Sequence, residues 1–186
     1  MQAILGGMAL EHAIVVSLLE KPGTGYELAR RFDRSIGFFW AASHQQIYRV
    51  LHRMTADGWV DIAEVPDEAH RITKVYTVTD AGRAALAAWM RAPSEPEQHR
   101  SDLGVKVRGA AFDDPAVLVA DVTGHRDAHA ERLALYTEIE ERDFPAGETR
   151  DSARRLQHLV LRAGIRYEQG WLAWCEEVLT ELGDMT

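Results

Sequence analysis

Residues 43–57 combine side chains suited to nucleic-acid recognition with the spacing of a helix. Ile47, Val50, Leu51 and Met54 recur at i, i+3, i+4 and i+7, so this stripe should be buried. Arg and Gln side chains read base edges in the major groove, which is wide enough to admit a helix. No carboxylate lies on the opposite face, which comprises His44, Gln45, Tyr48, Arg49, His52 and Arg53.

Capping signals predict where this helix and the one before it begin. Ser43 and Gln46 have the spacing of a capping box, in which each side chain satisfies a backbone N–H group of the other residue. Thr24 and Glu27 repeat that spacing and predict a short preceding helix. A first apolar helix is expected to end near residue 21, so two helices precede the one that carries the polar face.

Two β-rich runs follow, over residues 59–65 and 72–79, and a predominantly polar loop of six residues separates them. We interpret them as a hairpin. Arg71 in its loop and Lys74 on its second strand are positioned to contact phosphates without reading sequence. A helix capped by Thr79 should come next.

The order helix, helix, helix, strand, strand, helix predicts a winged helix-turn-helix over residues 1–92. Residues 93–186 are expected to be helical, with Asp114-Pro115 opening one helix and residues 152–182 forming the last. At 1.5 Å per residue, this last helix would be about 45 Å long. The predicted fold class is mainly α with a small β-hairpin wing: a DNA-binding domain followed by a C-terminal helical dimerisation domain.

The last helix carries one continuous apolar seam. Because the seam is longer than a small domain needs, part of it is expected to pack against a second copy of the chain, giving a homodimer. Its aromatic members could also stack on a small aromatic or cationic ligand. The expected dimer contacts are Leu156, Val160, Tyr167, Trp171, Trp174 and Val178, and the expected ligand contacts are Tyr167, Trp171 and Trp174.

The charge is distributed unevenly between the two halves. The net charge is −8, but residues 1–92 carry ten Lys/Arg and ten Asp/Glu, whereas residues 93–186 carry eleven and nineteen. The acidity therefore lies wholly in the second half, which supports two modules with different tasks. A neutral first half permits DNA binding without demonstrating it.

Other chemistries have little support in the sequence. Cys175 lies inside a predicted helix, where Glu176 should raise the pKa of the thiol. A thiol with a raised pKa is a poor nucleophile at neutral pH. His125 and His129 share a helical face, but no third metal ligand is evident nearby. No glycine-rich phosphate loop or nucleophile elbow is present. We expect neither enzyme activity, nor a cofactor, nor a metal.

The first twenty residues are apolar but lack a basic leader, and Glu11 and His12 interrupt the run, so we interpret them as a core helix. No segment predicts a membrane span, and the lone cysteine suits a cytoplasmic setting. The alternative is a winged-helix module that contacts protein without binding DNA. The polar face argues against this alternative, because protein-contact surfaces more often display apolar anchors.

Three segments together resemble the PadR family of transcriptional regulators, in family order and spacing. The acidic helical half is similar to the longer type of this family, with a C-terminal domain like that of the virulence activators. The resembling segments are Gly25-Tyr26-Glu27-Leu28, Ser43-His44-Gln45-Gln46-Ile47-Tyr48, and the run from Lys74 to Arg83.

The resemblance implies a homodimer that binds an inverted-repeat operator, usually as a repressor, with the recognition helix in the major groove. Many relatives respond to aromatic or cationic molecules in an apolar space at the dimer interface. Arg49 departs from the family, which often has proline after the tyrosine, and this puts the operator sequence in doubt. The residues expected to contact DNA are Ser43, His44, Gln45, Gln46, Tyr48, Arg49, Arg53, Arg71 and Lys74.

Overall fold

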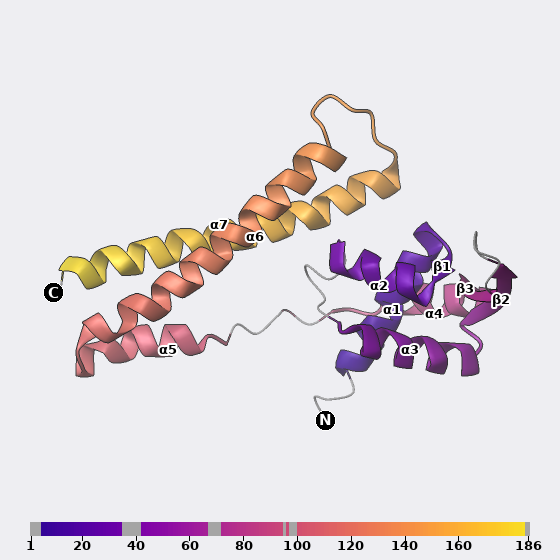
Figure 1. Ribbon diagram of the computed structural model, residues 1–186, viewed down its shortest axis with the longest axis horizontal. Helices are drawn as coiled ribbons and strands as arrows, with labels where there is room; N and C mark the ends of the chain where they lie inside the picture. The colour runs from indigo at the N-terminus through magenta and orange to yellow at the C-terminus, as the bar shows by residue number, and fades with distance from the viewer. Residues whose placement is uncertain (1–4, 35–41, 67–71, 95, 97–99, 185–186) are drawn as a thin grey trace. The chain divides into compact units, whose positions relative to one another are not determined.

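The chain forms two compact units, Met1–Pro96 and Glu97–Thr186, in a computed structural model (Figure 1). All the strands that the structure describes belong to the first unit. The described residues are 5–34, 42–66, 72–94, 96 and 100–184.

The first unit confirms the predicted order of helices and strands and adds one short strand. Its elements are α1 (Leu5–Glu20), β1 (Gly23–Thr24), α2 (Gly25–Arg34), α3 (His44–Ala56), β2 (Val60–Pro66), β3 (Ile72–Val78) and α4 (Asp80–Arg91).

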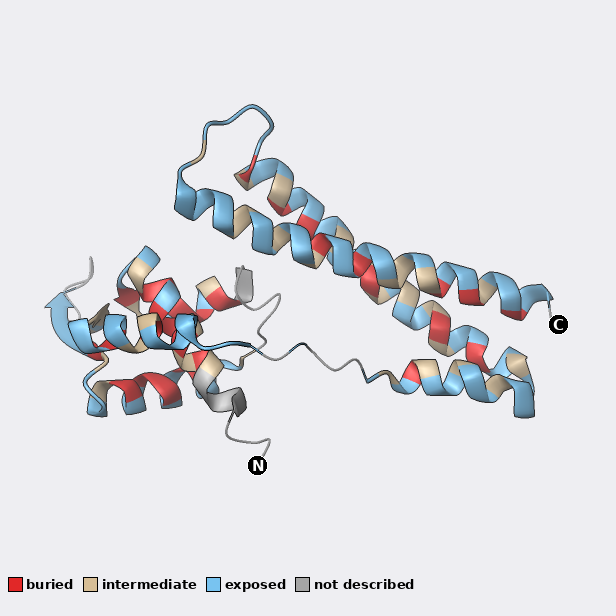
Figure 2. Ribbon diagram, turned by 180° about the vertical axis from the view of Figure 1, so that it is seen from behind, coloured by how far each residue is buried: buried red, intermediate tan, exposed pale blue. Residues whose placement is uncertain are grey.

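The core of this unit lies where α1, α2 and α3 meet, as the buried residues in Figure 2 show. The predicted stripe of α3 is confirmed, because its four apolar residues are all buried. They pack in one cluster with Ile14 and Leu18 of α1 and with Leu28 and Phe32 of α2. Burial of each large apolar side chain is worth about 1.5–3 kcal/mol, so this cluster holds α3 in place.

The wing is an antiparallel sheet with the strand order β1-β3-β2. In β1, Gly23 pairs with Tyr76 and Thr24 pairs with Val75. The sequence predicted only the β2–β3 hairpin, because a two-residue strand has no hydrophobic periodicity of its own. The pairing attaches the start of α2 directly to the wing.

A close backbone approach joins α4 to the end of α3. The Thr79 side chain caps α4 by accepting from Gly82 N at 3.1 Å, and it donates to the carbonyl oxygen of Gly58 at 2.7 Å. A Cβ on Gly82 would lie 2.4 Å from the carbonyl oxygen of Trp59. Only glycine therefore fits at position 82. Gly58 has φ +71°, the left-handed conformation that favours glycine in the turn after α3.

The second unit is helical in the part that the structure describes. Its elements are α5 (Asp102–Gly109), the 3₁₀ turns η2 (Ala110–Phe112) and η3 (Pro115–Leu118), α6 (Val119–Asp143) and α7 (Ser152–Asp184). Asp114 caps a 3₁₀ turn rather than the long helix itself, and α6 begins only at Val119. A 3₁₀ turn at a helix start is common.

Helices α6 and α7 run antiparallel along one another (Figure 1). Glu140 pairs with His158 at one end, and His129 pairs with Glu168 near the middle. At the other end, Val122 of α6 joins an apolar cluster with Val178 and other residues of α7. The turn between the helices contains Gly147 with φ +82°.

The apolar seam of α7 is divided between two environments. Val178 is 7% exposed in the core of its own unit, and Trp171 and Trp174 pack against that core. Leu156, Val160 and Tyr167 are 63%, 42% and 55% exposed. The buried stripe of α7 instead includes Ile165, Glu168, Cys175 and Leu182. The chain's own packing therefore accounts for Val178 without a second copy.

Candidate nucleic-acid interface

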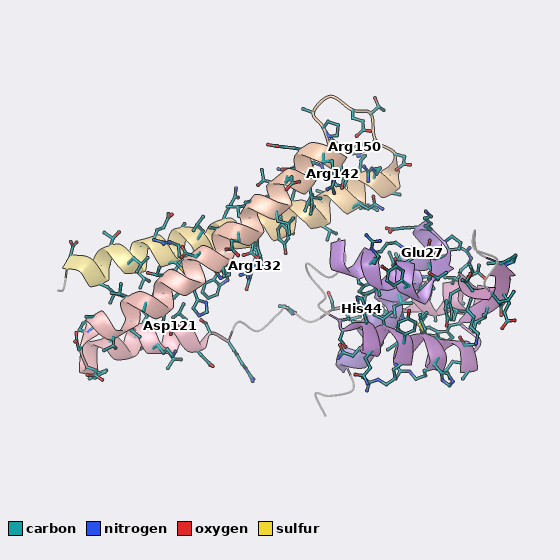
Figure 3. The ribbon with its side chains drawn as sticks, in the orientation of Figure 1. Glu27, His44, Asp121, Arg132, Arg142 and Arg150 are labelled. Carbon is teal, nitrogen blue, oxygen red and sulfur yellow. The ribbon has the colours of Figure 1, made fainter. Side chains whose placement is uncertain are left out.

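The exposed face of α3 is polar and basic along its length. His44, Gln45, Tyr48, Arg49 and His52 are all exposed, and α3 contains no acidic residue. Figure 3 labels His44 at the start of this helix. The buried stripe packs against the core, so the polar face is turned to solvent. A helix face of this composition can donate to base acceptors and to phosphates alike.

The start of α3 is a complete capping box, as predicted. Ser43 Oγ accepts from Gln46 N at 3.2 Å, and Gln46 Oε1 accepts from Ser43 N at 2.8 Å. Their side-chain hydrogen bonds fix the first turn of the helix and so orient the polar face. That both residues also contact DNA stays a prediction.

The Tyr48 ring packs against Gly25, the first residue of α2. A Cβ on Gly25 would be 2.4 Å from Cε1 of the Tyr48 ring. On β3 of the wing, burial and the electrostatic interaction with Tyr48 raise the pKa of the Tyr76 phenol. The tyrosine of α3 is thus in close contact with the start of α2, which the sequence pattern did not reveal.

The two arginines of α3 have different surroundings. Arg53, in the last turn, forms an ion pair with Glu11 of α1. This pair neutralises one cation that was expected to contact DNA and links α3 to α1. Arg49 is exposed one turn earlier, at the position where it could reach a base or a phosphate.

The wing contributes one described cation. Lys74 is exposed on β3, and its Cα is paired in register with that of Glu64 on β2. Arg71 lies outside the described residues. The Lys74 charge is thus available to a phosphate but is partly offset by a neighbouring carboxylate.

The capping box of α2 fixes the helix that precedes α3. Glu27 accepts from Thr24 N at 2.7 Å, and Glu27 N donates to Thr24 Oγ1 at 3.2 Å. The backbone bond from Thr24 lowers the pKa of Glu27. Arg31 donates to the carbonyl oxygen of Ser17 at 2.8 Å, which ties α2 to α1. These hydrogen bonds therefore fix the start of α2 and attach α2 to the last turn of α1.

The aromatic residues of α7 surround a buried ionic group that the sequence pattern missed. His129 Nδ1 lies 2.5 Å from Glu168 Oε2 and 2.8 Å from a terminal guanidinium nitrogen of Arg132, and Arg132 donates from Nε to Glu168 Oε1 at 3.2 Å. The Trp171 ring stacks on His129 with a centroid distance of 5.2 Å. Glutamate is normally exposed, so hydrophobic periodicity could not assign Glu168 to the core.

The remaining candidate groups have structural surroundings. Burial raises the pKa of Cys175, and Glu176 adds to the rise as predicted, although Arg126 opposes it. His125 lies 3.8 Å from Asp121. Among the residues that the structure describes, no group of three metal-ligating side chains occurs, and no helix is long and apolar enough to cross a membrane.

Two family descriptions match consecutive parts of the chain. Residues 14–88 match the PadR-like family of transcriptional regulators, and residues 99–183 match the C-terminal domain of the virulence activator alpha type. Together they span the winged helix and the helical unit in that order.

Individual proteins are similar over nearly the whole chain. The probable transcriptional regulator Rv1176c of Mycobacterium tuberculosis is 44% identical, and the match covers 94% of this chain and 98% of that one. The structure of the Vibrio cholerae virulence activator AphA is 32% identical with a TM-score of 0.81, covering 95% and 99%.

Bacillus subtilis PadR has a similar fold. Its structure in complex with operator DNA has a TM-score of 0.79 at 23% identity, covering 94% of this chain and 99% of that one. Its structure in complex with p-coumaric acid has a TM-score of 0.76, also at 23% identity, covering 95% and 97%. The predicted winged-helix fold is thereby confirmed.

Proposed function

The chain belongs to the PadR-like family of transcriptional regulators, and from that membership we propose that it binds a specific duplex DNA as a homodimer and represses transcription there. The observation that carries this proposal is the exposed face of α3, which is polar, basic and free of carboxylates. The existence of a Bacillus subtilis PadR complex with operator DNA supports it.

In this proposal α3 enters the major groove and the wing touches the backbone. Gln45, Tyr48 and Arg49 read base edges, while Lys74 and Arg71 contact phosphates. Ser43 and Gln46 hold the first turn, and His44 and Arg53 lie at the two ends of the contact. A dimer would place two such helices on half-sites about 34–36 Å apart, one turn of DNA.

The second unit would supply the dimer contact. Leu156, Val160 and Tyr167 are exposed on α7 and are the side chains that a second copy would cover. A dimer binds two half-sites as one unit, which raises its affinity well above that of a single winged helix. We also propose that the protein acts in the cytoplasm.

A small aromatic or cationic effector would release the DNA. The complex of Bacillus subtilis PadR with p-coumaric acid supports a ligand of this class. In this chain Tyr167, Trp171 and Trp174 would stack on it. Titration of p-coumaric acid and related phenolic acids into the full chain, followed by tryptophan fluorescence, tests this part. An unchanged spectrum at saturating ligand would contradict phenolic binding.

The experiment that tests DNA binding is selection from a random-sequence duplex library with the full-length chain. A single enriched motif with two inverted half-sites is the expected result. A library without enrichment would contradict the proposal, and the winged-helix protein-interaction module would then be the better account. Affinity for the enriched duplex should also resist excess competitor of scrambled sequence, since only specific contacts separate the two.

A further inference from the structure

The Tyr48 ring occupies the space that a Cβ at position 25 would fill, so any other residue there requires the ring to shift. An ideal Cβ there would lie 2.4 Å from Cε1 and 3.1 Å from Cζ of the tyrosine ring, and real Cβ atoms essentially never approach within 3.0 Å. Gly25 is buried although it is the first residue of α2, whereas Tyr48 remains 47% exposed. The ring therefore covers the glycine on one side and faces solvent on the other.

Backbone conformation does not account for a glycine at this position. Among the described residues, the glycines with positive φ are Gly58 and Gly147. Gly25 is the first residue of α2, where alanine would be preferred over glycine by helix propensity. The missing side chain is thus explained by the space that the Tyr48 ring occupies.

The wing is joined directly to the start of α2, where Gly25 lies. Strand β1 ends immediately before Gly25, and its pairing with β3 sets Gly23 opposite Tyr76. The electrostatic interaction between the Tyr76 and Tyr48 phenols, which raises the pKa of Tyr76, is consistent with this proximity. The pairing of β1 with β3 therefore attaches the wing to the residue against which the Tyr48 ring packs.

We propose that Gly25 is a positioning residue for DNA recognition, because the space at its Cα seats the Tyr48 ring at the orientation in which α3 presents it to the duplex. This inference rests on the proposed function. A ring that is already held in one orientation loses less rotamer freedom on binding than a free one. The contact with Gly25 therefore raises the affinity for DNA, although Gly25 itself does not touch DNA. Alanine at position 25 would displace the Tyr48 ring from this position while leaving the core of the unit intact.

A double-mutant cycle tests the proposal with the full-length chain and the duplex that the parent selects from a random library. The four proteins are the parent, Gly25→Ala, Tyr48→Ala and the double variant. Gly124→Ala is the matched control, because Gly124 lies in a helix and a Cβ there would meet nothing within 4 Å. Fluorescence anisotropy at fixed salt gives the dissociation constants, and thermal unfolding gives the midpoints.

We expect Gly25→Ala to weaken binding by about tenfold in the parent background, the scale of one lost base or phosphate contact. The same change should have no effect once Tyr48 is alanine, since no ring remains to be displaced. The unfolding midpoint should be unchanged or higher, because alanine favours the helix. Gly124→Ala should bind as the parent does.

Two results would overturn the proposal. Equal losses in both backgrounds would mean that Gly25 acts independently of Tyr48, and unchanged binding by Gly25→Ala would mean that the seat has no role. If the parent selects no sequence at all, the proposed function fails first and this inference fails with it. Proton NMR adds a test without DNA: the Gly25 Hα resonances should be shifted by the ring current of Tyr48 and should lose that shift in Tyr48→Ala.

Discussion

His129 of α6 and Glu168 of α7 form a buried pair, with 2.5 Å between Nδ1 and Oε2 and with side chains 9% and 6% exposed. Arg132 reaches the second carboxylate oxygen from a more exposed position on α6, which Figure 3 labels midway along the helix. One carboxylate on α7 therefore binds two side chains of α6. It fixes the register of the two helices as well as contributing to their packing.

Glu168→Ala should destabilise the helical unit strongly. It removes the buried carboxylate that both His129 and Arg132 contact, and breaking a buried ion pair in this way costs about 3–5 kcal/mol. Urea unfolding of the full chain measures the loss. Glu177→Ala, an exposed carboxylate of the same helix, should change stability by less than about 0.5 kcal/mol. Equal effects of the two substitutions would contradict the buried pairing.

Gly82→Ala should destabilise the winged-helix unit. The added Cβ would meet the carbonyl oxygen of Trp59, a backbone atom that cannot rotate away, so α4 must move at a cost of about 1–3 kcal/mol. Thermal unfolding measures the effect. Gly124→Ala in α6 makes the same chemical change in open space and should stabilise by about 0.5–1 kcal/mol. A stabilising Gly82→Ala would show that the approach of α4 to Trp59 is wrong.

Local sequence signals predicted the elements better than the contacts between them. Both capping boxes and the buried stripe of α3 follow from spacing within one helix, so the sequence could reveal them. The seat of Tyr48 on Gly25 could not be predicted, because it joins residues distant in sequence and depends on how α2 meets α3. Glu168 was missed for a related reason. A carboxylate can be buried only where it has partners, and the partners of Glu168 lie on another helix.

The capping box of α2 should make stability depend on pH. The bond from Thr24 N lowers the pKa of Glu27 below its ordinary value of 4.5, so the charged form is favoured in the folded state. This contribution is present above the unfolded pKa and is lost as the pH falls through the folded one. Glu27→Gln should therefore be less stable than the parent at pH 7, and the difference should disappear in acid.

Chemical unfolding of both proteins across that range measures the difference. Glu177→Gln, the same chemical change at an exposed carboxylate of α7, is the control. A stability difference between Glu27→Gln and the parent that stays constant down to low pH would contradict the assigned role of the Glu27 charge.

The exposed half of the α7 seam should hold the dimer. Val160→Glu with Tyr167→Glu should give monomers that remain folded, because both side chains are exposed within one chain. Val178→Glu should instead unfold the helical unit, since Val178 lies in its core. Sedimentation and circular dichroism separate the two outcomes. A dimer that survives the double substitution would place the contact between chains elsewhere.

The ratio of affinities for the selected duplex and a scrambled duplex tests the central claim, that α3 reads DNA sequence, most directly. At fixed salt, Arg49→Ala and Tyr48→Ala should each lower this ratio by about tenfold or more, because they remove contacts that distinguish bases. Arg108→Ala removes the same charge from an exposed position on α5 and should leave the ratio unchanged. If the ratios for Arg49→Ala and Tyr48→Ala equal that of the parent, α3 is not the element that recognises the sequence.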